Sequence, residues 1–282
     1  MERVINIIPY FLNRLKGCAT NNEITNWAYL SIENVLGLNR SDCILQSELK
    51  LSKEVANRFV SIVDELIKSR PIQHIIGEVK FCGFNLKVDH SALIPRPETE
   101  ELVDWLINDN LNIDNKKRVI DLCTGSGCIG ISIDINNNYL DVTISDISNK
   151  ALKVCEINKK NLNSKVKIIE LDLNLISREN KKYDIIISNP PYIPPSESDL
   201  LDKNVKYEPD IALFTPKDNP LHFYEKIFEF ASLNLSNNGI IYLEINPNFI
   251  KEFNQLLTNY SVNHVNFKND FRGKKRLVKV IF

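Results

Sequence analysis

The sequence lacks paired cysteines and any spacing typical of a metal site. Its cysteines are scattered, none forms a C-x-x-C pair, and four histidines accompany them. The six cysteines are Cys18, Cys43, Cys82, Cys123, Cys128 and Cys155. This pattern argues against a structural zinc site and against a disulfide framework, so we expect no bound metal. Scattered cysteines are typical of small core residues in a reducing compartment, which predicts a cytoplasmic protein.

Long apolar runs and an excess of charge are also missing. No apolar stretch approaches the length of a bilayer span, and Met1-Glu2-Arg3 leads into no signal-peptide pattern, so we expect no membrane association. A net charge of −1 gives no electrostatic reason for strong nonspecific nucleic-acid binding. What is present is ordinary for a globular protein: 282 residues with 43% apolar content, enough for one large domain or two modest ones.

The chain divides into three parts. Residues 1–71 carry apolar residues at helical spacing and predict a small helical bundle, with Asn21-Asn22 and Ser52 as candidate helix caps. Residues 72–92 lose that period and predict a connector of two short strands with glycine turns. Residues 93–282 remain as the largest domain.

Strand and helix patterns alternate from Arg118 onward. Strands are predicted at residues 119–122, 142–145, 166–171, 185–188 and 240–245. Helices are predicted at residues 128–136, 149–162, 221–235 and 248–257. Two further strand-like runs, 262–267 and 276–282, have no helix between them and should pair as a hairpin at the sheet edge. The pattern therefore predicts an α/β fold with a mostly parallel sheet, crossover helices and an antiparallel edge.

The first strand of that domain runs into a glycine-rich turn. Gly125, Gly127 and Gly130 satisfy G-x-G-x-x-G, a pattern that lets the backbone turn tightly into a helix and approach a ligand. In a dehydrogenase this turn would face a pyrophosphate, whereas in a methyltransferase it would lie against the amino-acid tail of S-adenosylmethionine. The predicted cofactor-binding loop consists of Cys123, Thr124, Gly125, Ser126 and Gly127.

Two acidic residues follow at the ends of the next two strands. Asp146 lies about 20 residues beyond the glycine turn, where an acid can bind ribose hydroxyls in either class of enzyme. Asp172 is a candidate partner for an adenine amino group. For both residues the alternative stays open that they only terminate strands or cap helices.

The fourth strand is followed by Asn189-Pro190-Pro191-Tyr192. The two prolines force an extended course, and Asn189 comes at the carboxyl end of a strand, where open α/β sheets bind ligands. An asparagine side-chain carbonyl and the Pro190 carbonyl are two acceptors for the two protons of a planar NH2 group, and the ring of Tyr192 offers a face for stacking. The alternative is a plain proline-rich turn. The asparagine and tyrosine that flank the two prolines make this alternative less favoured.

A site for an NH2 group next to a glycine turn favours methyl transfer over hydride transfer. The combination resembles S-adenosylmethionine-dependent methyltransferases that modify exocyclic or amide NH2 groups, on adenine or on glutamine. The resemblance implies that Asn189, Pro190 and Tyr192 are catalytic and that Asn189, Pro190, Pro191 and Tyr192 bind the substrate. It also places Asn189 against the cofactor.

Further segments narrow the resemblance to one family. Arg70–Gly77, Phe81-Cys82-Gly83, the segment from Ile94 to Glu100, Tyr207-Glu208-Pro209 and the segment from Asp270 to Arg276 resemble the HemK/PrmC family of peptide chain release factor glutamine N5-methyltransferases. The resemblance implies a Rossmann-like class I methyltransferase domain behind a small N-terminal helical domain. It also implies methylation of the glutamine in the Gly-Gly-Gln loop of class 1 release factors, with the front bundle docking that partner. We expect a monomer that binds no nucleic acid directly.

Two other functions stay under consideration. An adenine-N6 methyltransferase acting on DNA or RNA would use the same two acceptors, although the front domain is nearly neutral and no basic insertion is present to read a nucleic acid. A dehydrogenase is the third candidate. Because glutamate lacks the two donors of an amide, the lead function predicts that glutamate is rejected as a substrate.

Some positions depart from the family pattern. Cys123 and Asn246 stand where the family commonly has glycine, and Leu173 lacks the aromatic ring that some relatives place near the adenine. Arg96 and Glu98 support two interpretations, since Pro97 followed by acids is also an ordinary helix start. These residues could steady the active-site loop, begin a helix, or do both.

Overall fold

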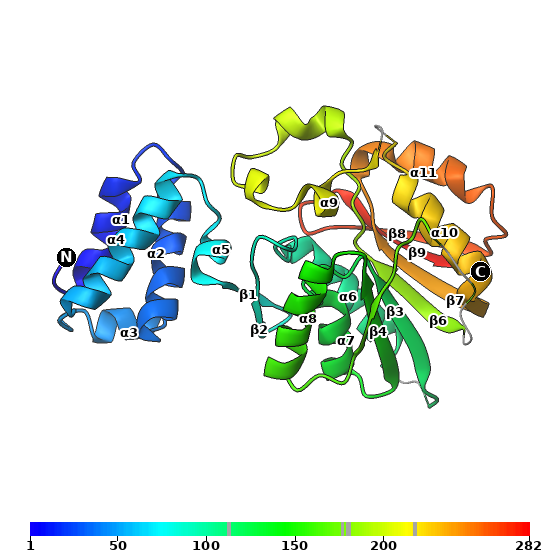
Figure 1. Cartoon of the computed structure of the whole chain (residues 1–282), viewed down its shortest axis with the longest axis horizontal. Coiled ribbons are helices and arrows are strands. Elements are labelled where there is room, and N and C mark those ends of the chain that lie inside the picture. The colour runs from blue at the N-terminus through cyan, green and yellow to red at the C-terminus, as the bar shows by residue number, and fades with distance from the viewer. Residues whose placement is uncertain (112–113, 176–177, 179–181, 217–218) are drawn as a thin grey trace. The chain divides into compact units, whose positions relative to one another are not determined.

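The computed structural model describes residues 1–111, 114–175, 178, 182–216 and 219–282, and these residues form two compact units. The first unit comprises Met1–Gly77 and Asp202–Tyr207, and the second comprises Glu78–Leu201 and Glu208–Phe282 (Figure 1). Each unit has an apolar core of its own.

The first unit is helical. Its helices are α1 (Ile7–Arg14), α2 (Asn21–Leu36), α3 (Arg40–Leu45), α4 (Lys53–Ile67) and α5 (Ile72–Ile76), with short 3-10 turns η1 (Val4–Asn6) and η3 (Val205–Tyr207). Apolar residues at helical spacing turn inward, so that Phe11, Ile24, Ile32, Phe59 and Val63 are fully buried in one cluster.

Of the two predicted helix caps, one is confirmed and one is wrong. Ser52 caps α4, because its side chain accepts a hydrogen bond from the Val55 N–H at 3.2 Å. The candidate cap Asn21-Asn22 is wrong, since both residues lie inside α2. The cap is Thr20, which accepts from the Glu23 N–H while Glu23 accepts from the Thr20 N–H, a reciprocal capping box.

The segment after the bundle also differs from the expectation. Residues 72–76 form helix α5 and not a strand, because Ile72, Ile75 and Ile76 pack against the core of the first unit. The helix ends at Gly77 with φ at 76°. The two strands begin only there, as the antiparallel pair β1 (Glu78–Phe81) and β2 (Phe84–Lys87).

A seven-stranded sheet organises the second unit. Its strands are β3 (Lys117–Leu122), β4 (Leu140–Asp146), β5 (Lys167–Glu170), β6 (Tyr183–Ser188), β7 (Leu235–Glu244), β8 (His264–Asn269) and β9 (Lys275–Ile281). The order is β5-β4-β3-β6-β7-β9-β8, with β3 to β7 parallel to one another and β9 antiparallel to both of its neighbours. The predicted mostly parallel sheet with an antiparallel edge hairpin is confirmed.

Helices cover both faces of this sheet (Figure 1). They are α6 (Pro97–Asp109), α7 (Cys128–Asn136), α8 (Asn149–Asn161), α10 (His222–Asn234) and α11 (Ile250–Leu257), beside the short α9 (Asp210–Leu213), η2 (Pro195–Leu200) and η5 (Pro247–Phe249). Successive strand residues point to opposite layers: Val119 packs in the cluster with α6 to α8, and Ile120 in the cluster with α10 and α11. Among the described helices, none has the length and apolar character needed to cross a membrane.

One glycine lets α7 lie directly on the sheet. A Cβ atom on Gly130 would lie 2.2 Å from Cγ2 of Ile144 in β4, a distance that no side chain could accept. The helix that follows the glycine turn is therefore held close to the strands.

The strand order reverses between β3 and β6. From β3 the chain proceeds outward to β4 and β5, and it then returns to add β6 and β7 on the other side. At such a switch point the loops at the carboxyl ends of the strands diverge and leave a crevice. The loops after β3, β4 and β6 open at this edge.

Candidate active site

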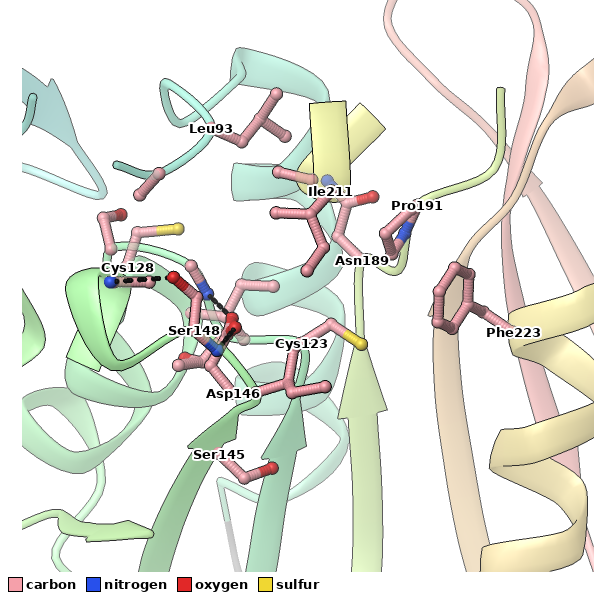
Figure 2. Close-up of a pocket in the computed structure, with 18 of the residues that line it drawn as sticks. Leu93, Cys123, Cys128, Ser145, Asp146, Ser148, Asn189, Pro191, Ile211 and Phe223 are labelled. Carbon is pink, nitrogen blue, oxygen red and sulfur yellow. Dashed lines mark hydrogen bonds between the residues drawn. The ribbon is translucent and has the colours of Figure 1, made fainter. Parts of the chain in front are cut away.

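A pocket occupies the crevice at the carboxyl edge, and most of the predicted site residues line it (Figure 2). The predicted residues in its wall are Cys123, Thr124, Gly125, Ser126, Asp146, Asp172, Asn189 and Pro191. Three predicted site residues, Gly127, Pro190 and Tyr192, are not part of that wall. The structure thus brings together side chains from four strand ends that are far apart in the sequence.

Asp146 anchors the turn after β3. Its Oδ2 accepts a hydrogen bond from the Gly125 N–H and its Oδ1 accepts one from the Ser148 N–H, both at 2.9 Å (Figure 2). Burial raises the pKa of this carboxyl, and the backbone N–H groups oppose that effect. Each carboxylate oxygen has a further lone pair, so Asp146 can hold the loop and still accept hydrogen bonds from a ligand.

Asp121 supports the same turn from below, a role that the sequence interpretation missed. It is fully buried, and its Oδ2 accepts hydrogen bonds from the Thr124 hydroxyl and, at 3.0 Å, from the Gly130 N–H. Its Oδ1 has no partner among the described residues. Burial raises the pKa of Asp121 to about 7.

Cys123 adopts a backbone conformation that glycine usually takes. Its φ is 58°, in the left-handed region, which agrees with its place at a family glycine. Cys123 is partly buried and lines the pocket, and burial raises the pKa of its thiol far above the ordinary value. The turn therefore tolerates a small side chain at the cost of backbone strain.

The far side of the pocket is mostly apolar. Leu171 and Leu173 line it after β5, and Phe223 of α10 adds an aromatic ring that Leu173 lacks. Asp172 lies between these leucines, and its Oδ1 accepts hydrogen bonds from the Asn174 backbone N–H at 2.8 Å and from the Asn174 side chain at 2.9 Å. Asp172 thus closes a local turn and also faces the pocket.

Asn189 belongs to a chain of hydrogen bonds that ends on a buried acid. Its Nδ2 donates to the Thr99 Oγ1 at 3.1 Å, and the Thr99 hydroxyl donates to Oε2 of Glu244 at 2.7 Å. The Tyr192 hydroxyl donates to the other oxygen, Oε1, at 3.0 Å. Glu244 is only 2% exposed at the end of β7, and burial raises its pKa against these hydrogen bonds and the charge of Arg276.

Tyr192 is held from its backbone as well. Its carbonyl accepts a hydrogen bond from Nδ2 of Asn246 at 3.2 Å, and burial followed by the nearby Glu244 charge raises the pKa of its hydroxyl. Asn246 has φ at −70°, so this position does not use the conformational freedom of the family glycine that it replaces.

Ion pairs hold the segment before α6 and the first turn of that helix. The Arg96 guanidinium contacts Oε1 of Glu208 at 2.5 Å, and Oε2 of Glu208 accepts the Ile94 N–H at 2.9 Å. Glu98 pairs with Arg272 at 3.3 Å. Because α6 also begins at Pro97, directly after Arg96, the segment is both a helix start and a cross-linked loop.

Three supporting residues were missed by the sequence interpretation. Asp121 and Glu244 carried a signal that could have been used, since each is an acid within or next to a run of buried apolar residues near the end of a strand. Thr99 carried none, because a threonine in the first turn of a helix is unremarkable.

The fold and this site define a methyltransferase, and comparison with known families agrees. The methyltransferase small domain matches residues 102–203, and the PrmC N-terminal domain matches residues 9–77. A release factor glutamine methyltransferase from Flavobacterium psychrophilum is 39% identical over 98% of this chain and 98% of its own length. The corresponding enzyme of Bacteroides thetaiotaomicron is 34% identical over 96% of this chain and 98% of its own. The chain belongs to the family of release factor glutamine methyltransferases.

Solved structures with little sequence identity share the fold. The catalytic domain of hMettl16, in complex with the MAT2A 3'UTR hairpin 1, has a TM-score of 0.57 and 13% identity, and the match covers 98% of this chain and 90% of that one. A methyltransferase from Pyrococcus furiosus has a TM-score of 0.50 and 15% identity, covering 71% of this chain and 89% of that one. At such identities the likeness concerns the class I methyltransferase fold alone.

Proposed function

We propose that this protein transfers a methyl group from S-adenosylmethionine to the side-chain amide nitrogen of the glutamine in the Gly-Gly-Gln loop of peptide chain release factors. The observation that carries the proposal is the placement of Asn189 in the pocket wall beside the loops after β3 and β4. Curated relatives of nearly the same length, which are named release factor glutamine methyltransferases, support the choice of substrate.

The pocket has the donor and acceptor set that S-adenosylmethionine needs. The Asp146 carboxylate suits ribose hydroxyls, Leu171 and Leu173 suit an adenine face, and the turn around Gly125 exposes backbone to the amino-acid tail. The space beside Gly125 is open: among the described residues, the nearest atom that an added Cβ would meet is the Cβ of Ala92, at 3.9 Å. When bound, the sulfonium supplies an electrophilic methyl group.

Two acceptors are available for the protons of an amide. No described residue donates a hydrogen bond to Oδ1 of Asn189 or to the carbonyl of Pro190. If each accepts one hydrogen bond from the glutamine NH2, the nitrogen lone pair gains electron density and has a fixed direction. Each of these hydrogen bonds contributes only about 0.5–1.5 kcal/mol, so binding alone does not account for catalysis.

Alignment supplies the larger share of the rate. Holding nitrogen and methyl carbon in line can be worth roughly 7–11 kcal/mol as effective concentration. With S-adenosylmethionine bound, transfer would form a nitrogen–carbon bond as the carbon–sulfur bond breaks, and the more acidic methylated nitrogen would then lose its proton to water. The mechanism needs no carboxylate base, and we assign to Tyr192 the packing that holds the amide plane.

The first unit is the part of the chain that we assign to docking of the release factor. Its match to the PrmC N-terminal domain supports that role. The alternative, an adenine-N6 methyltransferase on DNA or RNA, would use the same two acceptors, and it shares its fold with an RNA-bound structure that is 13% identical.

A methyl-transfer assay on the full chain tests the proposal. S-adenosylmethionine with a labelled methyl group is incubated with a Gly-Gly-Gln release factor in one reaction and with DNA or RNA in another. We expect label on the release factor alone, at the glutamine of the loop by mass spectrometry. Label on nucleic acid alone, or binding of NADH in place of S-adenosylmethionine, would overturn the proposal.

Asn189→Ala separates chemistry from cofactor binding. Because the alanine removes one of two acceptors and the alignment that depends on it, we expect methyl transfer to fall at least about a hundredfold. Affinity for S-adenosylhomocysteine, measured by calorimetry, should stay within a few-fold of the wild type. Retained turnover would mean that the acceptor is assigned to the wrong residue.

A further inference from the structure

We propose that Glu244, acting through Thr99, is a positioning residue that decides which end of the Asn189 amide faces the substrate. The inference rests on the proposed function, because it concerns how the same site distinguishes glutamine from glutamate. Neither residue contacts the reacting atoms in this scheme.

The polarity of the hydrogen-bond chain carries the argument. Both oxygens of Glu244 accept hydrogen bonds, and the Thr99 hydroxyl directs its single proton toward Oε2, 2.7 Å away. The Thr99 oxygen can then only accept from Asn189, and a side-chain amide can satisfy it only with its NH2 end, at 3.1 Å. The carbonyl end, Oδ1, is thereby turned away from Thr99 and left for a ligand.

Glu244 is built to be an acceptor at both oxygens. Its second oxygen accepts a hydrogen bond from the Tyr192 hydroxyl at 3.0 Å. Burial raises the pKa of Glu244, and the two hydrogen bonds and the Arg276 charge oppose that rise. Arg276 is itself held by Asp270, whose Oδ2 accepts from Nε at 2.8 Å. One buried acid therefore orients both the amide and the aromatic ring of the Asn189–Tyr192 segment.

The orientation matters because an asparagine amide is symmetric in shape and opposite in chemistry at its two ends. With Oδ1 toward the pocket, Asn189 accepts a hydrogen bond from a glutamine NH2 and repels a glutamate carboxylate. With Nδ2 toward the pocket, it would repel the glutamine NH2 and attract the carboxylate. Without a fixed partner at Thr99, the free energy difference between these two orientations would be small.

Substitutions at Thr99 separate this role from packing. Thr99→Val keeps the shape of the side chain and removes the hydroxyl, whereas Thr99→Ser keeps the hydroxyl and removes a methyl group. We expect kcat for methylation of the release factor to fall about tenfold to a hundredfold in Thr99→Val, as for an unpaired buried polar group, and to stay within a few-fold in Thr99→Ser. Thr99→Ala, which cannot overpack, should behave like the valine variant.

The preference for glutamine over glutamate in the loop is a second readout. A role of Thr99 in packing alone would leave this preference unchanged. A release factor with glutamate in place of the loop glutamine should bind the wild-type enzyme much more weakly than the glutamine form. In Thr99→Val this preference should shrink by about the same tenfold or more, because the amide can turn its NH2 end toward the carboxylate. Binding of S-adenosylhomocysteine, measured by calorimetry, should stay within a few-fold in each variant and reports that the second unit is folded.

The outcomes are distinguishable. If the wild type does not methylate the release factor, the proposed function fails. If the wild type is active but the valine variant equals it, or serine loses as much as valine, or the preference for glutamine is unchanged, then the positioning role of Glu244 and Thr99 is overturned.

Discussion

At the scale of single residues, the site depends on acids that are buried beneath it. Asp121 holds the glycine turn through Thr124 and Gly130, and Glu244 holds the Asn189 amide through Thr99. Neither acid is needed in our scheme as a general base. Each acts as a hydrogen-bond acceptor whose position is set by the strand that carries it. The loops after β3 and β6 are therefore held in place by the sheet.

Asp121 makes stability depend on pH. Its pKa rises from 3.8 to about 7 on folding, so between these values the folded state keeps a proton that the unfolded state has lost. Raising the pH through this window therefore lowers the free energy of unfolding, and the penalty is complete above about pH 7.

Asp121→Asn should make this dependence shallower, because the amide does not ionise. Urea unfolding followed by circular dichroism at several pH values between about 4 and about 7 measures the slope. Asp141→Asn, at an exposed acid of β4, is the matched control and should keep the wild-type slope. Equal slopes for Asp121→Asn and the wild type would contradict the assigned burial cost.

At the scale of elements, capping residues mark where helices begin, and the backbone conformation decides which of several neighbouring polar residues is the cap. The predicted caps of α2 were Asn21 and Asn22, but the structure uses Thr20, whose backbone is extended, with φ at −69° and ψ at 152°. Asn21 already has a place in the first turn. A cap is thus a property of backbone geometry as much as of residue type.

Thr20→Ala should destabilise the first unit by about 1 kcal/mol, the usual cost of losing a cap. Asn21→Ala is the matched control, because the Asn21 side chain makes no hydrogen bond among the described residues, and it should change stability by less than about 0.5 kcal/mol. Hydrogen exchange in the first turn of α2 measures both effects locally. Equal effects in the two variants would mean that Thr20 is not the cap.

At the scale of the whole molecule, the two units have separate cores and separate tasks in our proposal. The pocket is made entirely from residues of the second unit. A ligand that binds only the folded pocket stabilises that unit by mass action, by about 2.7 kcal/mol at a hundredfold excess over its Kd.

Saturating S-adenosylhomocysteine should therefore slow hydrogen exchange in the turn after β3 and in the loop after β4. Exchange in α1, α2 and α4 should change much less, because those helices share no pocket residue. Hydrogen exchange is measured by mass spectrometry with and without the ligand, and each measurement compares the two units within the same chain. Protection confined to the helices would place the cofactor site in the wrong unit.

Most of the fold could be predicted because its signals are local. Strands β3, β4 and β6 were found within two residues of their observed ends, since each is a short apolar run bounded by charge or turn residues. The helix at residues 72–76 could not be found in this way. It is only a turn and a half long, and its packing against the first unit decides its conformation.

The sequence by itself predicted, from residue type and spacing, which strand ends meet at the pocket. The glycine turn, the acids at strand ends and Asn189-Pro190-Pro191-Tyr192 follow from spacing, because strand ends of a parallel sheet meet at one edge. Only the tertiary structure decided how these residues are held. Thr99 lies 90 positions from Asn189 and 145 from Glu244, and a hydrogen bond between such distant positions depends on how α6 packs beside β7, which no local pattern encodes.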